Sequence, residues 1–226
     1  MSKNSSFRGL TVGLLSIWLF SLSAAACDIS ANVRVATNDD IKRFFADERK
    51  SVVTFIGYSG AGYEDEAAML QEAERILGGL DASSAIVNIG ATAEGIGAVY
   101  ELAKGKEFTT TGIVSTQARE SGADLSPCVD YVFYVEDASW GGFMDGSDRL
   151  SPTSAAMVEN SDVLIGIGGG EVGRDELMAA KRSGKAVRFT PADMNHQKAR
   201  EKASKKGLPV PTDFAGAASE LFLPTF

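Results

Sequence analysis

The chain has 226 residues, of which 44% are hydrophobic and 23% are charged, so its composition is that of a folded protein and excludes a disordered one. The 24 glycines against 6 prolines indicate many tight turns, and the length fits one domain. The formal net charge of −8 disfavours binding to a nucleic-acid backbone, which requires a basic surface, so we expect no nucleic-acid partner.

The N-terminus has the pattern of a secretory signal. Lys3 and Arg8 precede an apolar stretch, Leu10 to Leu22, which the small residues Ser23 to Ala26 follow. A permanent membrane helix is the alternative, but the stretch is shorter than the roughly 20 residues that span a bilayer. We therefore predict a signal peptide over residues 1–26 and an exported protein.

Cys27 follows three alanines, and this order is similar to a bacterial lipobox, in which the cysteine is lipidated and becomes the mature N-terminus. The motif departs at Ala24, where lipoboxes usually carry leucine. Lipidation of Cys27, followed by Asp28, predicts an anchor in the inner membrane facing the periplasm. Two alternatives remain open: plain cleavage after the small residues, and a disulfide between Cys27 and Cys128, the two cysteines of the chain.

A single domain is predicted over residues 39–226, after a polar tether over residues 27–38. Short apolar runs rich in β-branched residues alternate with helical stretches, which is typical of strands buried on both faces of a parallel sheet. The predicted strands are Val52–Ile56, Ala85–Ile89, Gly112–Ser115, Val129–Val135, Val163–Ile167 and Ala186–Phe189. The predicted helices are Asp39–Lys50, Glu64–Leu77, Ala93–Lys104, Thr116–Ser121, Thr153–Glu159 and Glu171–Arg182. The alternation predicts an α/β fold, a Rossmann-like doubly wound, mainly parallel sheet with helices on both faces.

Two segments fall outside this alternation. Residues 137–152 are rich in glycine and too long for a tight turn, so we predict a functional loop. Trp140 and Phe143 in this loop either stack on a base as a lid or fill the core. The C-terminal residues 207–226 are predicted to cover an open edge or groove through their apolar side chains.

A first glycine motif runs from a predicted strand into a helix. Glycine turns of this kind expose main-chain amides at a helix N-terminus, where they can receive an anion. The strict dinucleotide and P-loop patterns are absent, and a turn that only packs helix against strand is the alternative. The candidate ligand-binding residues are Gly57, Tyr58, Ser59, Gly60 and Gly62.

A second motif places three successive glycines between a strand and a helix. The glycines let a ligand lie directly on the main chain, and the free amides of the first helical turn attract phosphate. Both motifs are predicted at the carboxyl edge of the sheet, where α/β ligand clefts form. The candidate phosphate-binding residues are Gly168, Gly169, Gly170, Glu171, Gly173 and Arg174. Ser115, at the end of another strand, either contacts the ligand or caps a helix.

The second motif and its surroundings resemble the core of the SLOG superfamily, which includes the LONELY GUY-type, "lysine decarboxylase-like" proteins. The residues in register are Met157, Ser161-Asp162, Gly169-Gly170, Glu176 and Gly184-Lys185, and the first glycine motif resembles the family's first phosphate loop. The resemblance implies a Rossmann fold that binds nucleotides or related ligands and a homodimer paired through helices. It also implies that Glu176 acts near the ribose, as the candidate catalytic residue.

The family pattern is not complete. Gly168 stands in place of a proline, Val172 in place of a glycine and Gly173 in place of a threonine. The Arg-Lys pair of the phosphoribohydrolase members falls at Thr153 and Ser154, and neither side chain can clamp a phosphate as a guanidinium does.

Three functional hypotheses follow. The first is an envelope-anchored protein that holds a nucleotide or sugar-phosphate derivative across both glycine motifs. The second is a hydrolase that cleaves the N-glycosidic bond of a nucleoside monophosphate through Glu176. The third is a structural lipoprotein with an empty pocket. No resident cofactor is expected, and a metal site is not predicted because His196 is the single histidine and no Cys/His cluster surrounds it.

Overall fold

The computed structural model describes residue 27 and residues 32–222, so the predicted signal peptide lies outside the described residues. Its strands are β1 (Asn32–Val35), β2 (Ser51–Gly57), β3 (Ala85–Ile89), β4 (Thr109–Ser115), β5 (Tyr131–Val135), β6 (Val163–Ile167) and β7 (Ala186–Thr190). Its α-helices are α1 (Asn38–Glu48), α2 (Glu66–Leu77), α3 (Val99–Gly105), α4 (Gln117–Glu120), α5 (Pro152–Glu159), α6 (Glu171–Arg182) and α7 (His196–Lys205). Two 3₁₀ turns complete the list, η1 (Gly95–Ala98) and η2 (Ala217–Leu221).

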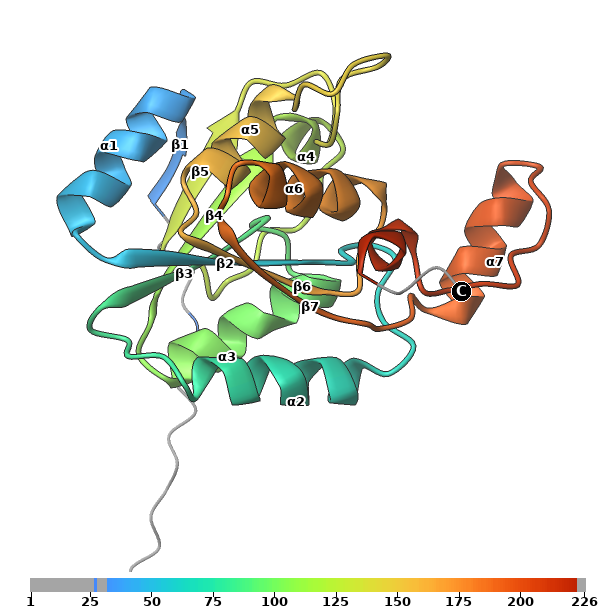
Figure 1. Cartoon of the computed structure of the whole chain (residues 1–226), viewed down its shortest axis with the longest axis horizontal. Helices are drawn as coiled ribbons and strands as arrows, with labels where there is room; N and C mark the ends of the chain where they lie inside the picture. The colour runs from blue at the N-terminus through green and yellow to red at the C-terminus, as the bar shows by residue number, and fades with distance from the viewer. Residues whose placement is uncertain (1–26, 28–31, 223–226) are drawn as a thin grey trace, which may run out of the picture.

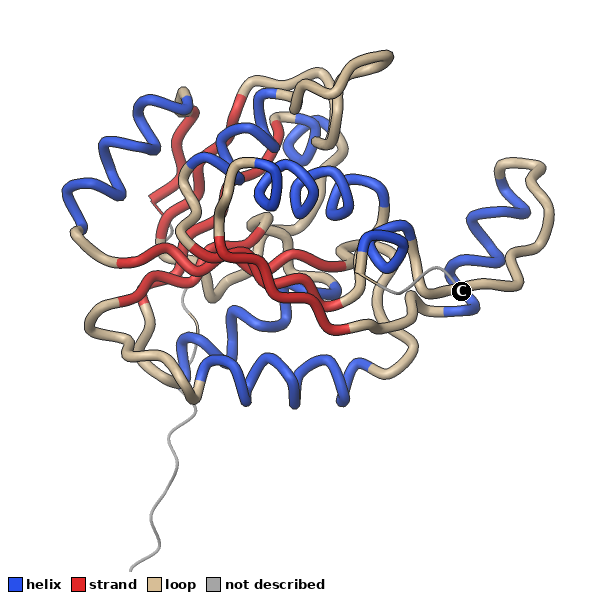
Figure 2. The backbone as a smooth tube through the Cα atoms, in the orientation of Figure 1, coloured by secondary structure: helices blue, strands red, loops and turns tan. Residues whose placement is uncertain are grey.

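The predicted fold class is confirmed. The seven strands form one sheet in the order β1-β5-β4-β3-β2-β6-β7, and every neighbouring pair is parallel. Helices α2 and α3 cover one face of the sheet, and α5 and α6 cover the other (Figures 1 and 2). The predicted strands at β3 and β6 have the observed bounds, because both strands are apolar runs between turns.

The predicted tether over residues 27–38 is wrong for residues 32–35, which form β1 beside β5 at the edge of the sheet. All four residues of β1 are exposed, so the strand has no buried run to reveal it in the sequence. Helix α7 was also not predicted, because it is polar throughout and buries only Ala203.

A buried polar network holds α5 on the sheet. The amide of Asn88 donates to Thr54 Oγ1 at 3.1 Å and to the sulfur of Met157 at 3.0 Å, and Thr111 Oγ1 donates to Asn88 Oδ1 at 2.9 Å. Thr54, Asn88 and Thr111 are fully buried, so an unmade bond here would be costly. The network sets the register of α5 and thereby positions Ser154, one turn before Met157.

Cys27 forms a disulfide with Cys128, and their Cα atoms are 4.7 Å apart. Lipidation would need the same sulfur of Cys27, so the predicted lipid anchor is incompatible with this structure and the disulfide alternative holds in it. Within the described residues, no helix is both apolar enough and long enough to cross a membrane.

Candidate functional site

The two glycine motifs lie side by side at the carboxyl edge of the sheet. β2 pairs with β6, and Gly57 stands opposite Ile167 at the end of both strands. Helices α2 and α6 leave these strands on opposite faces (Figure 1), so the β2–β6 junction is the point at which α/β folds form a ligand crevice.

Two tyrosines fill the space between the motifs. The hydroxyl of Tyr63 donates to the carbonyl of Ile167 at 2.7 Å and accepts from the amide of Tyr58 at 3.2 Å. Burial raises the pKa of Tyr63, which keeps this hydroxyl protonated as a donor. A methyl group on Gly168 would lie 2.6 Å from the ring of Tyr58. The phosphate cradle predicted between Gly57 and Gly168 is therefore occupied by the chain's own side chains.

The C-terminal segment covers the same junction from outside. The amide of Ala218 donates to the carbonyl of Gly169 at 3.0 Å, and the hydroxyl of Tyr58 donates to the carbonyl of Ala215 at 2.8 Å. Ala218 has no exposed surface, and a methyl group on Gly169 would lie 3.2 Å from its Cβ. The sequence-based expectation that the C-terminal residues cover an edge agrees with this packing.

The first glycine motif turns toward α7 rather than toward a ligand crevice. Ser59 and Gly60 are exposed, and Gly62 adopts φ +63°. The carbonyl of Gly62 accepts from the amide of Asn195 at 3.1 Å, and Lys198 Nζ donates to the carbonyl of Gly60 at 3.4 Å. These contacts make the loop the base on which α7 rests.

The first turn of α6 is the part of the predicted phosphate site that remains open. Gly170 occupies the N-cap and supplies no capping side chain. In the described part of the chain, the amides of Glu171, Val172 and Gly173 have no hydrogen-bond partner. A methyl group on Gly170 would meet no atom within 4 Å. Unpartnered amides and the positive end of the helix dipole together favour an anion at this position.

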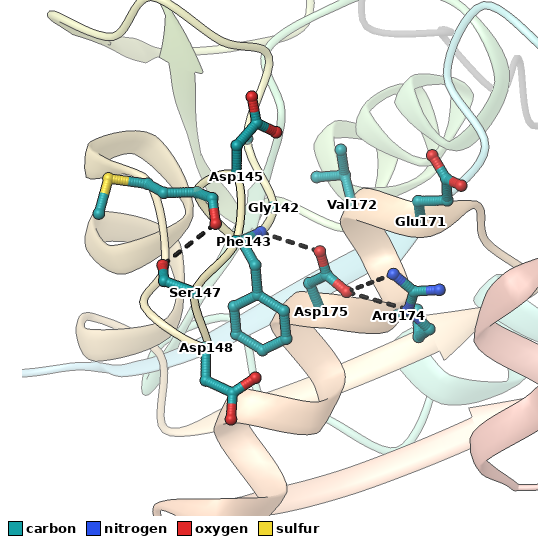
Figure 3. Close-up of a pocket in the computed structure, with 12 residues that line it drawn as sticks. Gly142, Phe143, Asp145, Ser147, Asp148, Glu171, Val172, Arg174 and Asp175 are labelled. Carbon is teal, nitrogen blue, oxygen red and sulfur yellow. Dashed lines mark hydrogen bonds and ion pairs between the residues drawn. The ribbon is translucent and has the colours of Figure 1, made fainter.

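A cavity of about 740 Å³ lies beside this turn, between α6 and the loop of residues 141–148 (Figure 3). Asp175 joins its two walls. One carboxylate oxygen accepts from the amide of Phe143 at 2.8 Å, and the other pairs with the guanidinium of Arg174 at 2.9 Å. The loop predicted to be functional therefore forms one wall of the cavity, and α6 forms the other.

The cavity lining is acidic. Its carboxylates are Asp145, Asp148, Glu171 and Asp175, against the single guanidinium of Arg174, which Asp175 already neutralises. Among the described residues, no three His, Cys, Asp or Glu side chains are grouped as metal ligands are. Carboxylates accept hydrogen bonds from hydroxyl and amino groups and repel further anions. The cavity lining thus suits a ligand that carries several hydrogen-bond donors, such as hydroxyl or amino groups, and at most one anionic group.

Glu176 is enclosed behind the cavity and is only 5% exposed. The hydroxyl of Ser154 donates to its carboxyl group at 2.6 Å and accepts from the amide of Gly142 at 2.7 Å. Burial and, to a smaller extent, the charge of Asp175 raise the pKa of Glu176 to about 7, although the hydrogen bond from Ser154 opposes this shift. A methyl group on Gly141 would lie 2.8 Å from Ser154 Oγ, so the loop closes tightly over this pair.

Glu176 and Ser154 are both positions to which the SLOG resemblance assigns a role in the hydrolase members, and here they contact each other. Ser154 stands at a position of the cationic pair that the resemblance implies, and it bonds Glu176, for which the resemblance implies a role near the ribose. The side chain of Glu176 does not line the cavity. The candidate catalytic carboxyl is therefore part of the packing beneath the loop.

Ser115 supports the loop as well. Its hydroxyl donates to the carbonyl of Ser139 at 2.6 Å and accepts from the amide of Gln117 at 3.1 Å. It is 1% exposed, and the N-cap of α4 is Thr116, so Ser115 bonds within the protein and is neither exposed to a ligand nor the N-cap residue. In the same loop, Trp140 is 52% exposed and Phe143 lines the cavity, so neither fills the core.

The sequence reasoning did not select Asp175, which holds the loop to α6. A signal was present, because Asp175 follows Glu171 by four residues and so lies on the same side of the helix. The resemblance points to the neighbouring Glu176 instead, because the motif that it matches carries a glutamate at that position.

No protein-family model matches this chain, and no curated protein matches it. Similar solved structures include the molybdenum cofactor carrier protein of Chlamydomonas reinhardtii, 20% identical over 76% of this chain and 96% of that chain, with a TM-score of 0.44. Another is the molybdenum cofactor binding protein of Rippkaea orientalis, 18% identical over 70% of this chain and 86% of that chain, with a TM-score of 0.47. At these TM-scores the similarity carries no argument about the ligand.

The role of Tyr63 can be tested with Tyr63→Phe, which leaves the amide of Tyr58 and the carbonyl of Ile167 buried without their shared partner. We expect the free energy of unfolding to fall by about 1–3 kcal/mol, measured by urea denaturation. Tyr131→Phe is the matched control, because Tyr131 is a half-buried tyrosine that packs against Phe44 and whose hydroxyl has no hydrogen-bond partner among the described residues. An equal loss in both variants would contradict the assignment.

The burial of Glu176 predicts a pH-dependent stability. Its pKa is raised from 4.5 to about 7 in the folded state, so the neutral carboxyl stabilises the fold below pH 4.5 and this stability is lost as the pH rises through 7. Glu176→Gln removes the titration. The free energy of unfolding of the wild type should therefore fall relative to that of Glu176→Gln as the pH rises from 4.5 to about 7. We expect this difference to grow by roughly 3 kcal/mol.

The matched control is Glu171→Gln, which removes an exposed carboxylate from the same helix. Chemical denaturation at a series of pH values gives both differences. A difference for Glu176→Gln that is as flat as that for Glu171→Gln would mean that the carboxyl is not desolvated.

Proposed function

We propose that the protein binds a small ligand with one phosphate group, of the nucleotide or sugar-phosphate class, in the cavity between α6 and residues 141–148. The observation that carries the proposal is that the open first turn of α6 borders this cavity of about 740 Å³. The phosphate would lie on the amides of Glu171, Val172 and Gly173, and the rest of the ligand would lie against the loop.

The charge of the lining narrows the class of ligand. Ribose hydroxyls and base amino groups can donate to Asp145, Asp148 and Asp175, and the ring of Phe143 offers an apolar contact. A diphosphate or triphosphate would bring further negative charge against these carboxylates. A monophosphate therefore fits this cavity better than a polyphosphate.

The site proposed here is narrower than the one predicted from the sequence. Tyr58, Tyr63 and Ala218 occupy the junction between the two glycine motifs, so a ligand cannot bridge them without displacing these residues. Of the two motifs, only the second contributes, through the residues at the start of α6.

Binding without hydrolysis is the function we favour over an N-glycosidic hydrolase. A hydrolytic role would need Glu176 to reach the ligand, but its carboxyl group is bonded to Ser154 under Gly141 and Gly142. The cationic pair that holds the phosphate in the family's hydrolases is replaced by Thr153 and Ser154.

We also propose that the protein is exported and works in an oxidising compartment, with cleavage after the small residues of the signal and no lipid on Cys27. The disulfide between Cys27 and Cys128 supports this location, because disulfides persist mainly outside the reducing cytosol.

The phosphate site can be tested with Gly170→Asp, which places a carboxylate at the N-cap of α6. Gly170 has an extended backbone, φ −85°, that an aspartate can adopt and from which it can accept from the first-turn amides. We expect the variant to gain a few tenths of a kcal/mol in stability. We also expect it to bind AMP at least tenfold more weakly than the wild type, with adenosine binding unchanged, measured by titration calorimetry.

Gly170→Ala is the control and should retain AMP binding, because a methyl group meets no neighbour there. No binding of AMP, ribose 5-phosphate or related monophosphates by the wild type would favour the structural hypothesis with an empty pocket. Release of free adenine from AMP, lost in Glu176→Gln, would favour the hydrolase.

The disulfide predicts a stability loss in Cys128→Ala. Because the bridge closes a loop across 101 positions of sequence, its removal should lower the free energy of unfolding by about 2–4 kcal/mol. Mass spectrometry of the protein isolated from its own cell envelope checks the chemical state directly. An unlipidated chain whose thiols react only after reduction is expected, and a diacylglyceryl group on Cys27 would overturn the proposal.

A further inference from the structure

Residues 195–213, called the arm here, project from the body of the molecule (Figures 1 and 2). The arm consists of α7 and the segment that returns from its end. Contacts with the body are at its base, where His196 stacks on Phe214 at 4.0 Å and the guanidinium of Arg200 lies 5.2 Å from the same ring. From residue 204 to residue 210 every side chain is exposed.

The arm is basic on a protein whose net charge is −8. Residues 198–206 contain five lysines and arginines and one glutamate. The lysines follow the spacing i, i+4, i+7 and i+8, which places them on one side of α7. They are Lys198, Lys202, Lys205 and Lys206. Among the described residues, only the first of them, at the base, comes near a carboxylate, Glu94 at 4.0 Å.

The end of the arm is apolar and uncharged. Leu208 is 58% exposed and Val210 is 68% exposed, and no charged residue occurs from 207 to 212. These two aliphatic side chains directly follow Lys205 and Lys206 in the chain. Exposed aliphatic groups next to a row of cations match the surface that peripheral proteins present to lipid, where the apolar groups enter the headgroup region and the lysines remain at its level.

We propose that the arm binds an anionic lipid surface, with Leu208 and Val210 inserted among the headgroups and the lysine side of α7 paired with lipid phosphates. The membrane contact is limited to the arm, because the anionic lipid surface repels the acidic body of the protein. A rigid acidic partner would need a shaped pocket for the two aliphatic side chains, whereas a fluid lipid layer does not. The arm thereby supplies a membrane contact that does not use Cys27, and it is independent of the proposed ligand site.

The test is sedimentation of the purified protein with vesicles of phosphatidylcholine alone or mixed with phosphatidylglycerol. We expect at least tenfold stronger partition onto the anionic vesicles, weakened by salt. Lys202→Glu with Lys205→Glu should reduce this partition at least tenfold. Leu208→Ser with Val210→Ser should reduce the fraction of protein that stays bound to the anionic vesicles at high salt, because apolar insertion is not screened by salt.

The matched control is Lys42→Glu with Arg43→Glu on α1, at the opposite end of the molecule (Figure 1), which makes the same change in charge. The substituted residues of the arm are exposed and make no ion pair within the described residues, so the arm variants should keep the wild-type melting temperature. The control also removes the exposed ion pair of Arg43 with Asp40, which contributes little to stability. The N-terminal sequence is the same in every variant, so any contribution that it makes cancels in the comparison between variants.

Equal partition onto neutral and anionic vesicles, or an equal loss in the α1 control, would overturn the proposal. Sedimentation velocity in the absence of lipid tests whether the arm binds a second copy of the chain. Self-association that the arm variant abolishes, without vesicle binding by the wild type, would make a second copy of the chain the partner of the arm instead of a membrane.

Discussion

The hydroxyl of Tyr63 bridges the end of β6 and the loop after β2 by hydrogen bonds to Ile167 and Tyr58. The arrangement of the carboxyl edge of the sheet depends on this contact. In many α/β folds the corresponding crevice is open, because the helices that follow two neighbouring strands leave on opposite faces. Here Tyr58 and Tyr63 fill the crevice from inside, and Ala218 covers it from outside. The open cavity at the carboxyl edge of the sheet therefore lies beside α6 instead of between the two glycine motifs.

That flank is built from elements that are distant in the sequence. The Asn88 network sets α5 on the sheet, α5 presents Ser154 to Glu176, and Asp175 holds the loop through the amide of Phe143. Each of these bonds is buried or partly buried, so together they give the cavity a defined wall. The raised pKa of Glu176 fits this role, because its protonated form avoids a second buried charge beside Asp175.

The distribution of charge divides the molecule into two regions, for which we propose different partners. The body, including the cavity lining, is acidic and suits a ligand with hydrogen-bond donors and a single phosphate. The arm concentrates cations and two exposed aliphatic side chains at the far side of the body from α1 (Figure 1). The disulfide at Cys27 and the basic arm support the two proposals made above, export to an oxidising compartment and a membrane contact through charge rather than through a covalent lipid.

The sequence by itself determined the sheet, the bounds of β3, β6 and α6, and the glycines that open the start of α6, because apolar runs and glycine turns are local signals. It did not reveal β1, which is exposed on both faces, or α7, which is almost wholly polar. The tertiary structure alone decided that Tyr63 and Ala218 close the predicted cradle and that Ser154 encloses Glu176. These contacts join residues that are far apart in the chain, and only the packing of the sheet and its helices brings them together.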